Sequence, residues 1–185
     1  NAWNKTFNIP TLITNCSNNF GPWQNPEKLI PLIILNALDG KDLPIYGKGN
    51  QIRDWLHVKD HCSAIKTILK KGIPSETYNI GGSNEIQNIE VVNIICNHLD
   101  IIKPRKASLK YSQLISHISD RPGHDARYAI DSYKISSQLG WKPKVSFKEG
   151  ISSTIEWYIK NKNWVNKVKN KSYSGWILEN YDKRQ

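Results

Sequence analysis

The chain has 185 residues, of which 38% are hydrophobic and 23% charged, a balance that supports a packed core and excludes a globally disordered protein. No apolar run approaches the ~20 residues that span a bilayer, and no apolar leader segment follows Asn1. The net charge of +10 admits nucleic acids, membrane surfaces and anionic small molecules as partners. Because the lysines are spread along the chain, we expect solvated helix faces, no nucleic-acid site and no membrane attachment.

The cysteines exclude two further classes of protein. Cys16, Cys62 and Cys96 have spacings that fit neither a zinc site nor a dense disulfide framework. We therefore expect no metal site, and reduced thiols that are mostly buried. The chain contains no Met and does not begin with one, which predicts a processed chain or a piece of a longer protein.

The first half of the chain alternates predicted strands and helices. A β-branched strand over residues 9–16 runs into a polar cluster and a Gly-Pro turn, which is typical of the ligand-binding edge of a parallel sheet. A helix over residues 27–38 follows, ended by Gly40. Strands over residues 44–47 and 53–58 precede a helix that begins at Asp60 and ends at Gly72. Its predicted inward face consists of Ala64, Ile65, Ile68 and Leu69.

The second half repeats this alternation. A strand over residues 76–82 ends in glycines, and a helix begins at Asn88 with Val91, Val92, Ile95 and Leu99 inward. Loops over residues 102–110 and 120–125 and an extended piece over residues 127–130 follow. Asp131 begins a helix that ends at Gly140, and a capping box at residues 146–149 begins another. The aromatic tail, residues 173–185, is expected to lie over the body. This order predicts the α/β class, without the Gly-x-Gly-x-x-Gly turn of a dinucleotide site.

Polar and basic turn residues are the first candidates for chemistry. Amides in the cluster of residues 17–22 suit phosphate or hydroxyl oxygens, although an ordinary Asx turn explains them equally well. Arg53 and Arg121 offer guanidinium forks that match two phosphate oxygens at once. The alternative for these two arginines is local pairing with the adjacent Asp54 and Asp120.

Aromatic residues near those turns form another candidate group. A flat base needs a stacking surface, which Tyr46, Trp55, His124 or Tyr181 would provide, although each of these residues also suits packing. No Ser/His/Asp order and no His-Glu-x-x-His motif points to hydrolysis. We assign no catalytic residue to this chain.

Several motifs in order carry a family resemblance. Asn15-Cys16-Ser17-Asn18-Asn19-Phe20-Gly21-Pro22 resembles the extended short-chain dehydrogenase/reductase superfamily. Asp120-Arg121-Pro122-Gly123-His124-Asp125 is similar to a loop of the dTDP-glucose 4,6-dehydratases within that superfamily. The likeness covers the whole chain and continues in residues 26–31, 43–49, 52–56, 78–82, 140–143 and 179–181.

The resemblance implies a fold and a division of the chain. The chain would be the C-terminal part of an NAD(P)-binding Rossmann-type enzyme with its smaller substrate-binding domain. Residues 1–21 would end the nucleotide-binding domain. Residues 22–185 would form mainly the sugar-nucleotide domain, with residues 52–72 returning to the first. The glycine fingerprint and the catalytic Tyr and Lys would precede Asn1, so the fragment would be inactive without its N-terminal half.

The resemblance also implies an activity. The complete enzyme would convert dTDP-glucose to dTDP-4-keto-6-deoxyglucose and water with NAD as cofactor, in deoxysugar (rhamnose-type) and cell-surface polysaccharide biosynthesis. It would be a cytoplasmic homodimer. The alternatives are another nucleotide-sugar epimerase or decarboxylase of the superfamily, or a non-catalytic sugar-nucleotide-binding protein.

Residue roles follow by the same resemblance. Cys16 and Asn19 would lie near the nicotinamide end of NAD. Arg53 and Arg121 would clamp the substrate diphosphate. The other implied substrate-binding residues are Asn18 and Asn88 near the pyrophosphate, Glu27, Lys28 and Leu29 along the substrate path, Pro44, Ile45 and Tyr46 on thymine and deoxyribose, and His124 and Tyr181 in the nucleotide pocket. Asn88 also suits a helix N-cap.

Overall fold

The computed structural model describes residues 2–169, 175 and 179–181. Its strands form small sheets that confirm the predicted α/β class. β1 (Ile13–Cys16) pairs in parallel with β5 (Thr77–Ile80), and β3 (Leu43–Tyr46) pairs in parallel with β7 (Ile115–Ile118). The remaining sheet has the order β2–β4–β6, with β8 also on β4; its strands are β2 (Asn18–Phe20), β4 (Ile52–His57), β6 (Glu85–Gln87) and β8 (Arg127–Tyr128).

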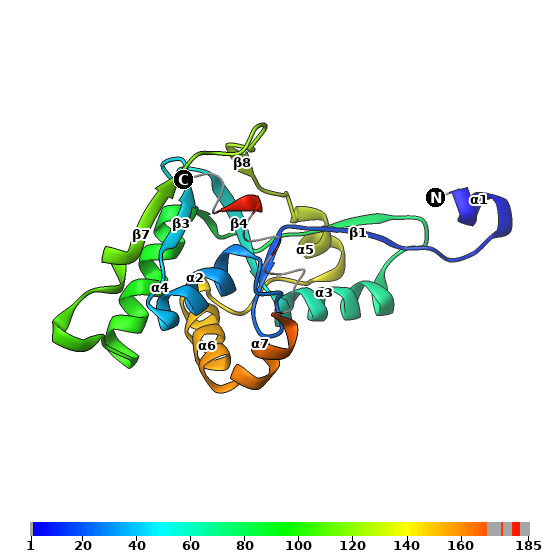
Figure 1. Ribbon diagram of the computed structural model, residues 1–185. Helices are drawn as coiled ribbons and strands as arrows, with labels where there is room; N and C mark the ends of the chain where they lie inside the picture. The colour runs from blue at the N-terminus through cyan, green and yellow to red at the C-terminus, as the bar shows by residue number, and fades with distance from the viewer. Residues whose placement is uncertain (1, 170–174, 176–178, 182–185) are drawn as a thin grey trace.

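Helices cover these strands in two groups (Figure 1). α2 (Leu29–Asp39), α4 (Asn88–Ile102), α6 (Phe147–Lys160) and α7 (Lys162–Val168) lie together in the lower left of the view. α3 (Val58–Lys71) and α5 (Tyr133–Leu139) lie beside β1 and β5. α1 (Ala2–Phe7) stands away from the body at the end of an extended segment, and η1 (Lys106–Ser108) and η2 (Tyr111–Leu114) follow α4.

Each helix group has its own apolar core. The larger core joins α2, α4 and α6 to β4, and the inward residues predicted for α4 are all fully buried in it. Burying a side chain of that size stabilises the fold by about 1.5–3 kcal/mol. The smaller core lies between β5, α3 and α5 and contains Leu56, Ala64, Ile68, Tyr78, Ile80 and Ile135.

Local signals in the sequence explain where several helices begin and end. Gly40 and Gly140 terminate α2 and α5 with φ of +69° and +71°, a conformation that glycine adopts without steric cost. The predicted capping box begins α6, since Ser146 Oγ accepts a bond from the amide of Glu149 and the Glu149 carboxylate accepts one from the amide of Ser146.

Other predictions about the elements are wrong in detail. The first strand begins at Ile13 and not at residue 9, and β2, read as a polar turn, is a strand. His57 caps α3 in place of Asp60, whose carboxylate instead accepts bonds from the amides of Lys144 and Val145. Gln87 takes the cap position of α4, so Asn88 is its first helical residue and not its cap.

The exposure of several side chains differs from what the sequence predicted. Ile65 and Leu69, predicted to face inward on α3, are 37% and 71% exposed. Cys62 is exposed, against the expectation of buried thiols, while Cys96 is buried and Cys16 intermediate. Most of the tail over residues 173–185 lies outside the described residues. In the part of the chain that the structure describes, no helix combines the length and the hydropathy of a membrane span.

The turn between β5 and β6 is fastened to β4. Asp54 Oδ2 accepts a hydrogen bond from the amide of Gly82 at 3.0 Å, and Asp54 Oδ1 accepts one from the amide of Asn84 at 2.9 Å. Gly82 lies so close to β4 that an added Cβ would stand 2.0 Å from the carbonyl oxygen of Trp55. Only glycine fits this contact without displacing the strand.

Candidate functional site

A cavity of about 150 Å³ lies where β3, β4 and the loop over residues 120–125 meet. It brings together most of the residues that the resemblance assigned to substrate binding. Its lining consists of Asn18, Leu29, Pro44, Ile45, Tyr46, Arg53, Trp55, Asn88, Arg121, His124 and Tyr181.

Strand geometry explains one wall of the cavity. Side chains alternate between the faces of a strand, so Arg53 and Trp55 project from the same face of β4. Asn18 is the register partner of Trp55 in the parallel pairing of β2 with β4. The sheet therefore gathers an amide, a guanidinium and an indole along one side of the cavity.

Aromatic rings form another wall. The ring of Tyr46 stacks on that of Tyr181, with centroids 5.4 Å apart and 17° between the planes. The ring of His124 meets Tyr46 edge-on at 5.9 Å. The Tyr46 hydroxyl donates a hydrogen bond to the carbonyl oxygen of Asn180 at 2.9 Å, which fixes the ring in place. The flat, apolar surface that results suits a planar base.

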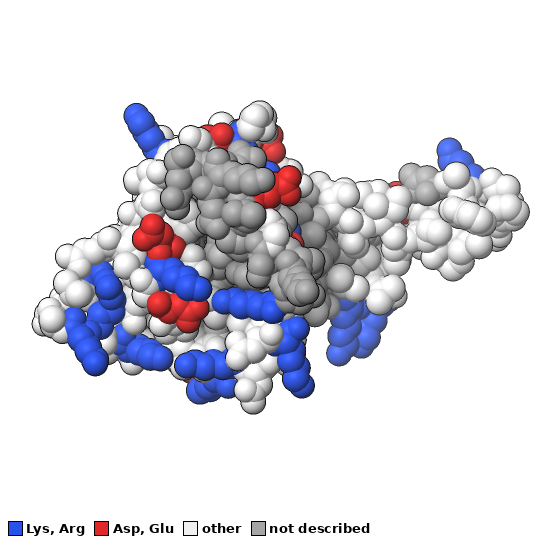
Figure 2. Space-filling view, in the orientation of Figure 1, with Lys and Arg blue, Asp and Glu red and all other residues white. Residues whose placement is uncertain are grey.

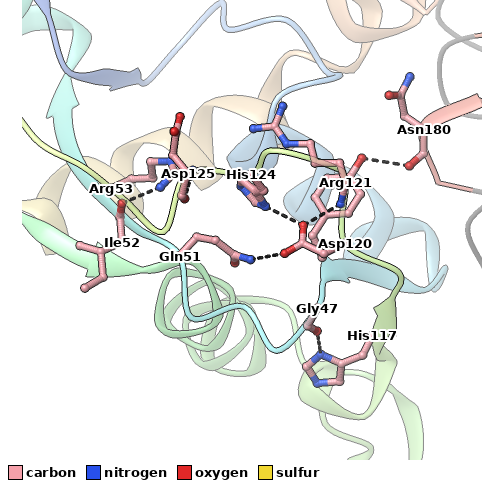
Figure 3. A network of polar contacts seen from close by, with 11 residues as sticks. Gly47, Gln51, Ile52, Arg53, His117, Asp120, Arg121, His124, Asp125 and Asn180 are labelled. Atoms are coloured by element: carbon pink, nitrogen blue, oxygen red, sulfur yellow. Dashed lines mark hydrogen bonds and ion pairs between the residues drawn. The ribbon is translucent and has the colours of Figure 1, made fainter.

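Arg53 is held by main-chain carbonyls. It is buried, and its guanidinium donates to the carbonyl oxygen of Ile52 at 2.7 Å and to that of Asp125 at 2.9 Å (Figure 3). Burial lowers the pKa of Arg53 from its usual value, the charge of Asp125 opposes this change, and the charge of Arg121 adds to it. Two guanidinium groups that influence each other in this way favour an anion between them.

A network around Asp120 holds the loop on the other side of the cavity (Figure 3). Asp120 Oδ1 lies 2.7 Å from His124 Nδ1 and accepts a bond from the amide of Arg121 at 2.8 Å. Asp120 Oδ2 accepts from Gln51 Nε2 at 2.7 Å. Partial burial raises the pKa of Asp120, but the bonds from His124, the Arg121 amide and Gln51 outweigh it and hold the pKa below its usual value.

These contacts contradict the local-pairing alternative for the two arginines. Asp54 is occupied by the turn over residues 82–84, and Asp120 binds the Arg121 amide and not its guanidinium. Among the described residues, the Arg121 guanidinium makes no hydrogen bond or ion pair, and Figure 3 shows it pointing away from the Asp120 network. It is free to bind a ligand.

Several polar atoms in the cavity lining are buried without a hydrogen-bond partner: Asn18 Oδ1, Trp55 Nε1 and Asn88 Oδ1. Buried polar groups in native proteins are nearly always paired, with protein groups, ordered water or a ligand. Trp55 was predicted only as one of four possible stacking rings and was not among the binding residues that the resemblance implied. The signal that identifies it is its position two residues after Arg53 on the same face of a strand.

The remaining predicted residues do not line the cavity. Glu27 and Lys28 pair with each other at 3.1 Å, directly before Leu29, which does line it. Cys16 ends β1, and Asn19 follows Asn18 in β2. Asn19 lines a second hollow of about 230 Å³ together with the segment from Phe20 to Gln24, and its Oδ1 is buried without a partner.

The spacing Tyr-x-x-x-Lys does occur in the sequence, at Tyr158 and Lys162. Tyr158 is fully buried, its hydroxyl donates to the carbonyl oxygen of Gln24, and burial raises its pKa. The two residues belong to different helices, α6 and α7. This spacing therefore forms no proton-transfer pair. Among the described residues, no cluster of three His, Cys, Asp or Glu side chains is arranged to hold a metal ion.

Known proteins share this sequence and architecture. The dTDP-glucose 4,6-dehydratase of Shigella flexneri is 58% identical over 184 residues, covering 100% of this chain and 50% of that protein. The chain spans about half the length of the curated relatives it matches. The crystal structure of dTDP-glucose 4,6-dehydratase from Bacillus anthracis in complex with NAD is 48% identical, with a TM-score of 0.80 over 91% of this chain and 50% of that one.

A second solved structure shows a similar likeness to this chain. The dTDP-glucose 4,6-dehydratase from Streptomyces venezuelae, crystallised with NAD bound, is 40% identical, with a TM-score of 0.82 over 91% of this chain and 49% of that one. The family model described as GDP-mannose 4,6 dehydratase matches residues 1–154. Because that match covers well over half of the sequence, the chain belongs to the GDP-mannose 4,6 dehydratase family, within the Rossmann-type extended short-chain dehydrogenase/reductases.

Proposed function

We propose that the polypeptide containing this chain is a dTDP-glucose 4,6-dehydratase, which converts dTDP-glucose to dTDP-4-keto-6-deoxyglucose and water. The observation that carries the proposal is the cavity, which combines two arginines with stacked aromatic rings. That combination suits a nucleoside diphosphate, because guanidinium groups bind phosphate oxygens and aromatic faces bind a base. The identity of 58% to a dTDP-glucose 4,6-dehydratase supports the choice of substrate.

The cavity residues would divide the substrate among them. Arg53 and Arg121 clamp the diphosphate, with Asn18 and Asn88 beside it. Thymine and deoxyribose pack on Tyr46 and the rings next to it. A volume of about 150 Å³ is below the ~300–1,000 Å³ of most ligand pockets. The cavity would thus hold one portion of the nucleotide, while the rest passes Leu29 toward Glu27 and Lys28.

NAD is the proposed cofactor, and it supplies hydride transfer when bound. The buried, unpaired Oδ1 of Asn19 fits a contact to the nicotinamide end, with Cys16 close by on β1. The N-terminal half of the same polypeptide would supply the glycine fingerprint and the catalytic Tyr and Lys, so the 185-residue chain alone would be inactive. Residues 1–21 and part of 52–72 would belong to the nucleotide-binding domain, and the rest of 22–185 mainly to the substrate domain.

The cellular setting follows the same proposal. The complete enzyme would be a cytoplasmic homodimer whose product feeds deoxysugar and cell-surface polysaccharide synthesis. In the view of Figure 2, most of the visible lysines and arginines lie along the lower edge of the molecule with uncharged surface between them, and we propose no nucleic-acid partner.

The test is a product assay on the complete native polypeptide with NAD, offering dTDP-glucose and UDP-glucose separately. We expect loss of one water, detected by mass, from dTDP-glucose alone. The 185-residue chain by itself serves as the control and should yield no product. No water loss from either substrate would refute the proposal and favour an epimerase, a decarboxylase or a non-catalytic binding protein.

A further inference from the structure

The loop over residues 120–125 is fastened to β4 at its far end. β8, which follows the loop, pairs in parallel with β4, and the Arg53 guanidinium donates to the carbonyl oxygen of Asp125 at 2.9 Å. This end of the loop is therefore fixed beside one of the two cavity arginines. Arg121 lies at the near end of the loop, so its position depends on a different set of contacts.

Asp120 fastens that near end to the turn between β3 and β4 (Figure 3). Its Oδ1 accepts a bond from the amide of Arg121 at 2.8 Å and lies 2.7 Å from His124 Nδ1. Its Oδ2 accepts a bond from Gln51 Nε2 at 2.7 Å. A Cβ added to Gly47, whose φ is +55°, would stand 3.3 Å from the same Oδ2, so the turn lies against the carboxylate. One side chain thus joins the segment that carries Arg121 to the segment that leads into β4.

The contact with Gln51 depends on the second oxygen of the carboxylate. Asparagine at position 120 has a single acceptor oxygen, so keeping the bonds at Oδ1 would set its NH₂ group against the NH₂ group of Gln51. Gln51 gains little by turning its amide over, because its Oε1 is buried without a hydrogen-bond partner. The turned amide would place an unpaired donor in that buried position. Asparagine therefore loses the contact that ties the loop to the turn.

We propose that Asp120 is a positioning residue for the diphosphate, which holds its loop against the turn before β4 and so sets the spacing between Arg121 and Arg53. This inference rests on the proposed function and deepens it. Asp120 does not line the cavity, and it acts on the ligand through Arg121.

The sign of the effect distinguishes positioning from charge. Asp120 carries a negative charge beside a site for an anionic ligand, so charge alone predicts tighter binding when that charge is removed. If Asp120 positions Arg121, its replacement by asparagine weakens binding instead.

The experiment measures dTDP affinity of the complete polypeptide by calorimetric titration. We expect Asp120→Asn to bind dTDP about tenfold more weakly than the wild type. Adding Gln51→Glu to this variant should restore the affinity to within about threefold of the wild type, because the asparagine NH₂ group then donates to a glutamate oxygen. Charge alone predicts the opposite change at this step also, since the glutamate adds a negative charge.

A second comparison tests whether Asp120 acts through Arg121. In an Arg121→Gln background, Asp120→Asn should change dTDP affinity by less than about twofold, because residues that act as one unit are not additive. Gln113→Glu is the matched control for Gln51→Glu. Gln113 lies outside the cavity lining and its Oε1 accepts a bond from the amide of Lys110, which glutamate can also accept. This control should leave dTDP affinity unchanged.

Unchanged or tighter dTDP binding in Asp120→Asn, no recovery in the double variant, or full additivity with Arg121→Gln would each overturn the inference. If Asp120→Asn does not fold, Asp120→Glu replaces it. Glutamate keeps the charge but lengthens the side chain against Gly47, so it should also weaken dTDP binding, whereas charge alone predicts no change.

A failure of the proposed function has a different outcome. Binding of UDP in place of dTDP, with the same loss and recovery, would refute the dehydratase assignment and keep the role of Asp120. A wild-type polypeptide that binds neither nucleoside diphosphate would overturn both.

Discussion

Replacing Arg121 with Gln separates ligand binding from folding. The Arg121 guanidinium makes no hydrogen bond or ion pair within the described part of the chain, so the substitution breaks none. Arg53 lacks this advantage, because its guanidinium donates to two carbonyl oxygens and its loss would also disturb β4. If Arg121 clamps the diphosphate, the variant loses a charge-assisted interaction worth about 1.5–3 kcal/mol. That corresponds to dTDP binding weakened roughly 10- to 150-fold.

The assay is calorimetric titration of dTDP into the complete polypeptide, with thermal unfolding measured in parallel. Arg105→Gln is the control, because Arg105 donates to the carbonyl oxygen of Lys110 outside the cavity lining. We expect Arg105→Gln to leave dTDP affinity unchanged and Arg121→Gln to leave the melting temperature unchanged. Unaltered dTDP affinity in Arg121→Gln would refute the clamp, and a lowered melting temperature would show that the side chain has a structural role.

Three further outcomes test other contacts. The pKa of Asp120 is depressed in the folded state, so its stabilisation is present above about pH 4 and is lost as the pH falls; the melting temperature of Asp120→Asn should therefore fall less on acidification than that of the wild type. Ser146→Ala should reduce the free energy of unfolding by about 1 kcal/mol in urea titrations, because it breaks the capping box of α6; Ser153→Ala serves for comparison. Iodoacetamide should label the exposed Cys62 first and leave Cys96, whose pKa burial raises to about 12, unmodified in mass spectra of the folded protein.

Local chemical signals predicted the parts of the fold that depend on a few neighbouring residues. Gly40, Gly140 and the Ser146–Glu149 box act within one helical turn, and each was placed correctly. The inward face of α4 was also predicted, because its apolar residues repeat at helical spacing and all meet the same core.

Predictions failed where distant segments decide the outcome. The face of α3 followed the helical repeat, but the smaller core contacts only Ala64 and Ile68, which leaves Leu69 exposed. Asp60 has the ordinary chemistry of a cap, yet its carboxylate is taken by amides about 85 residues away in sequence. The residues next to Asp60 in the sequence do not show that these distant amides bind its carboxylate.

Predictions about the cavity succeeded and failed for the same reasons. Arg53, Arg121, Tyr46, His124 and Tyr181 come from segments far apart in the sequence, and the family resemblance rather than spacing brought them together in the prediction. Trp55 was read only as one of several aromatic residues. Its unpaired N–H and its alignment with Asn18 depend on the pairing of β2 with β4, which the sequence did not predict because β2 was read as a turn.

The tight contact at Gly82 makes the cavity wall sensitive to a residue that does not line it. A side chain at this position would have to push away the carbonyl of Trp55, and with it the strand that carries Arg53. A screen for variants with weakened nucleotide binding should therefore recover substitutions at Gly82, although Gly82 does not line the cavity. Such a variant would look like a substrate-site mutant in kinetics, and only its structure would show that the defect began at the turn after β5.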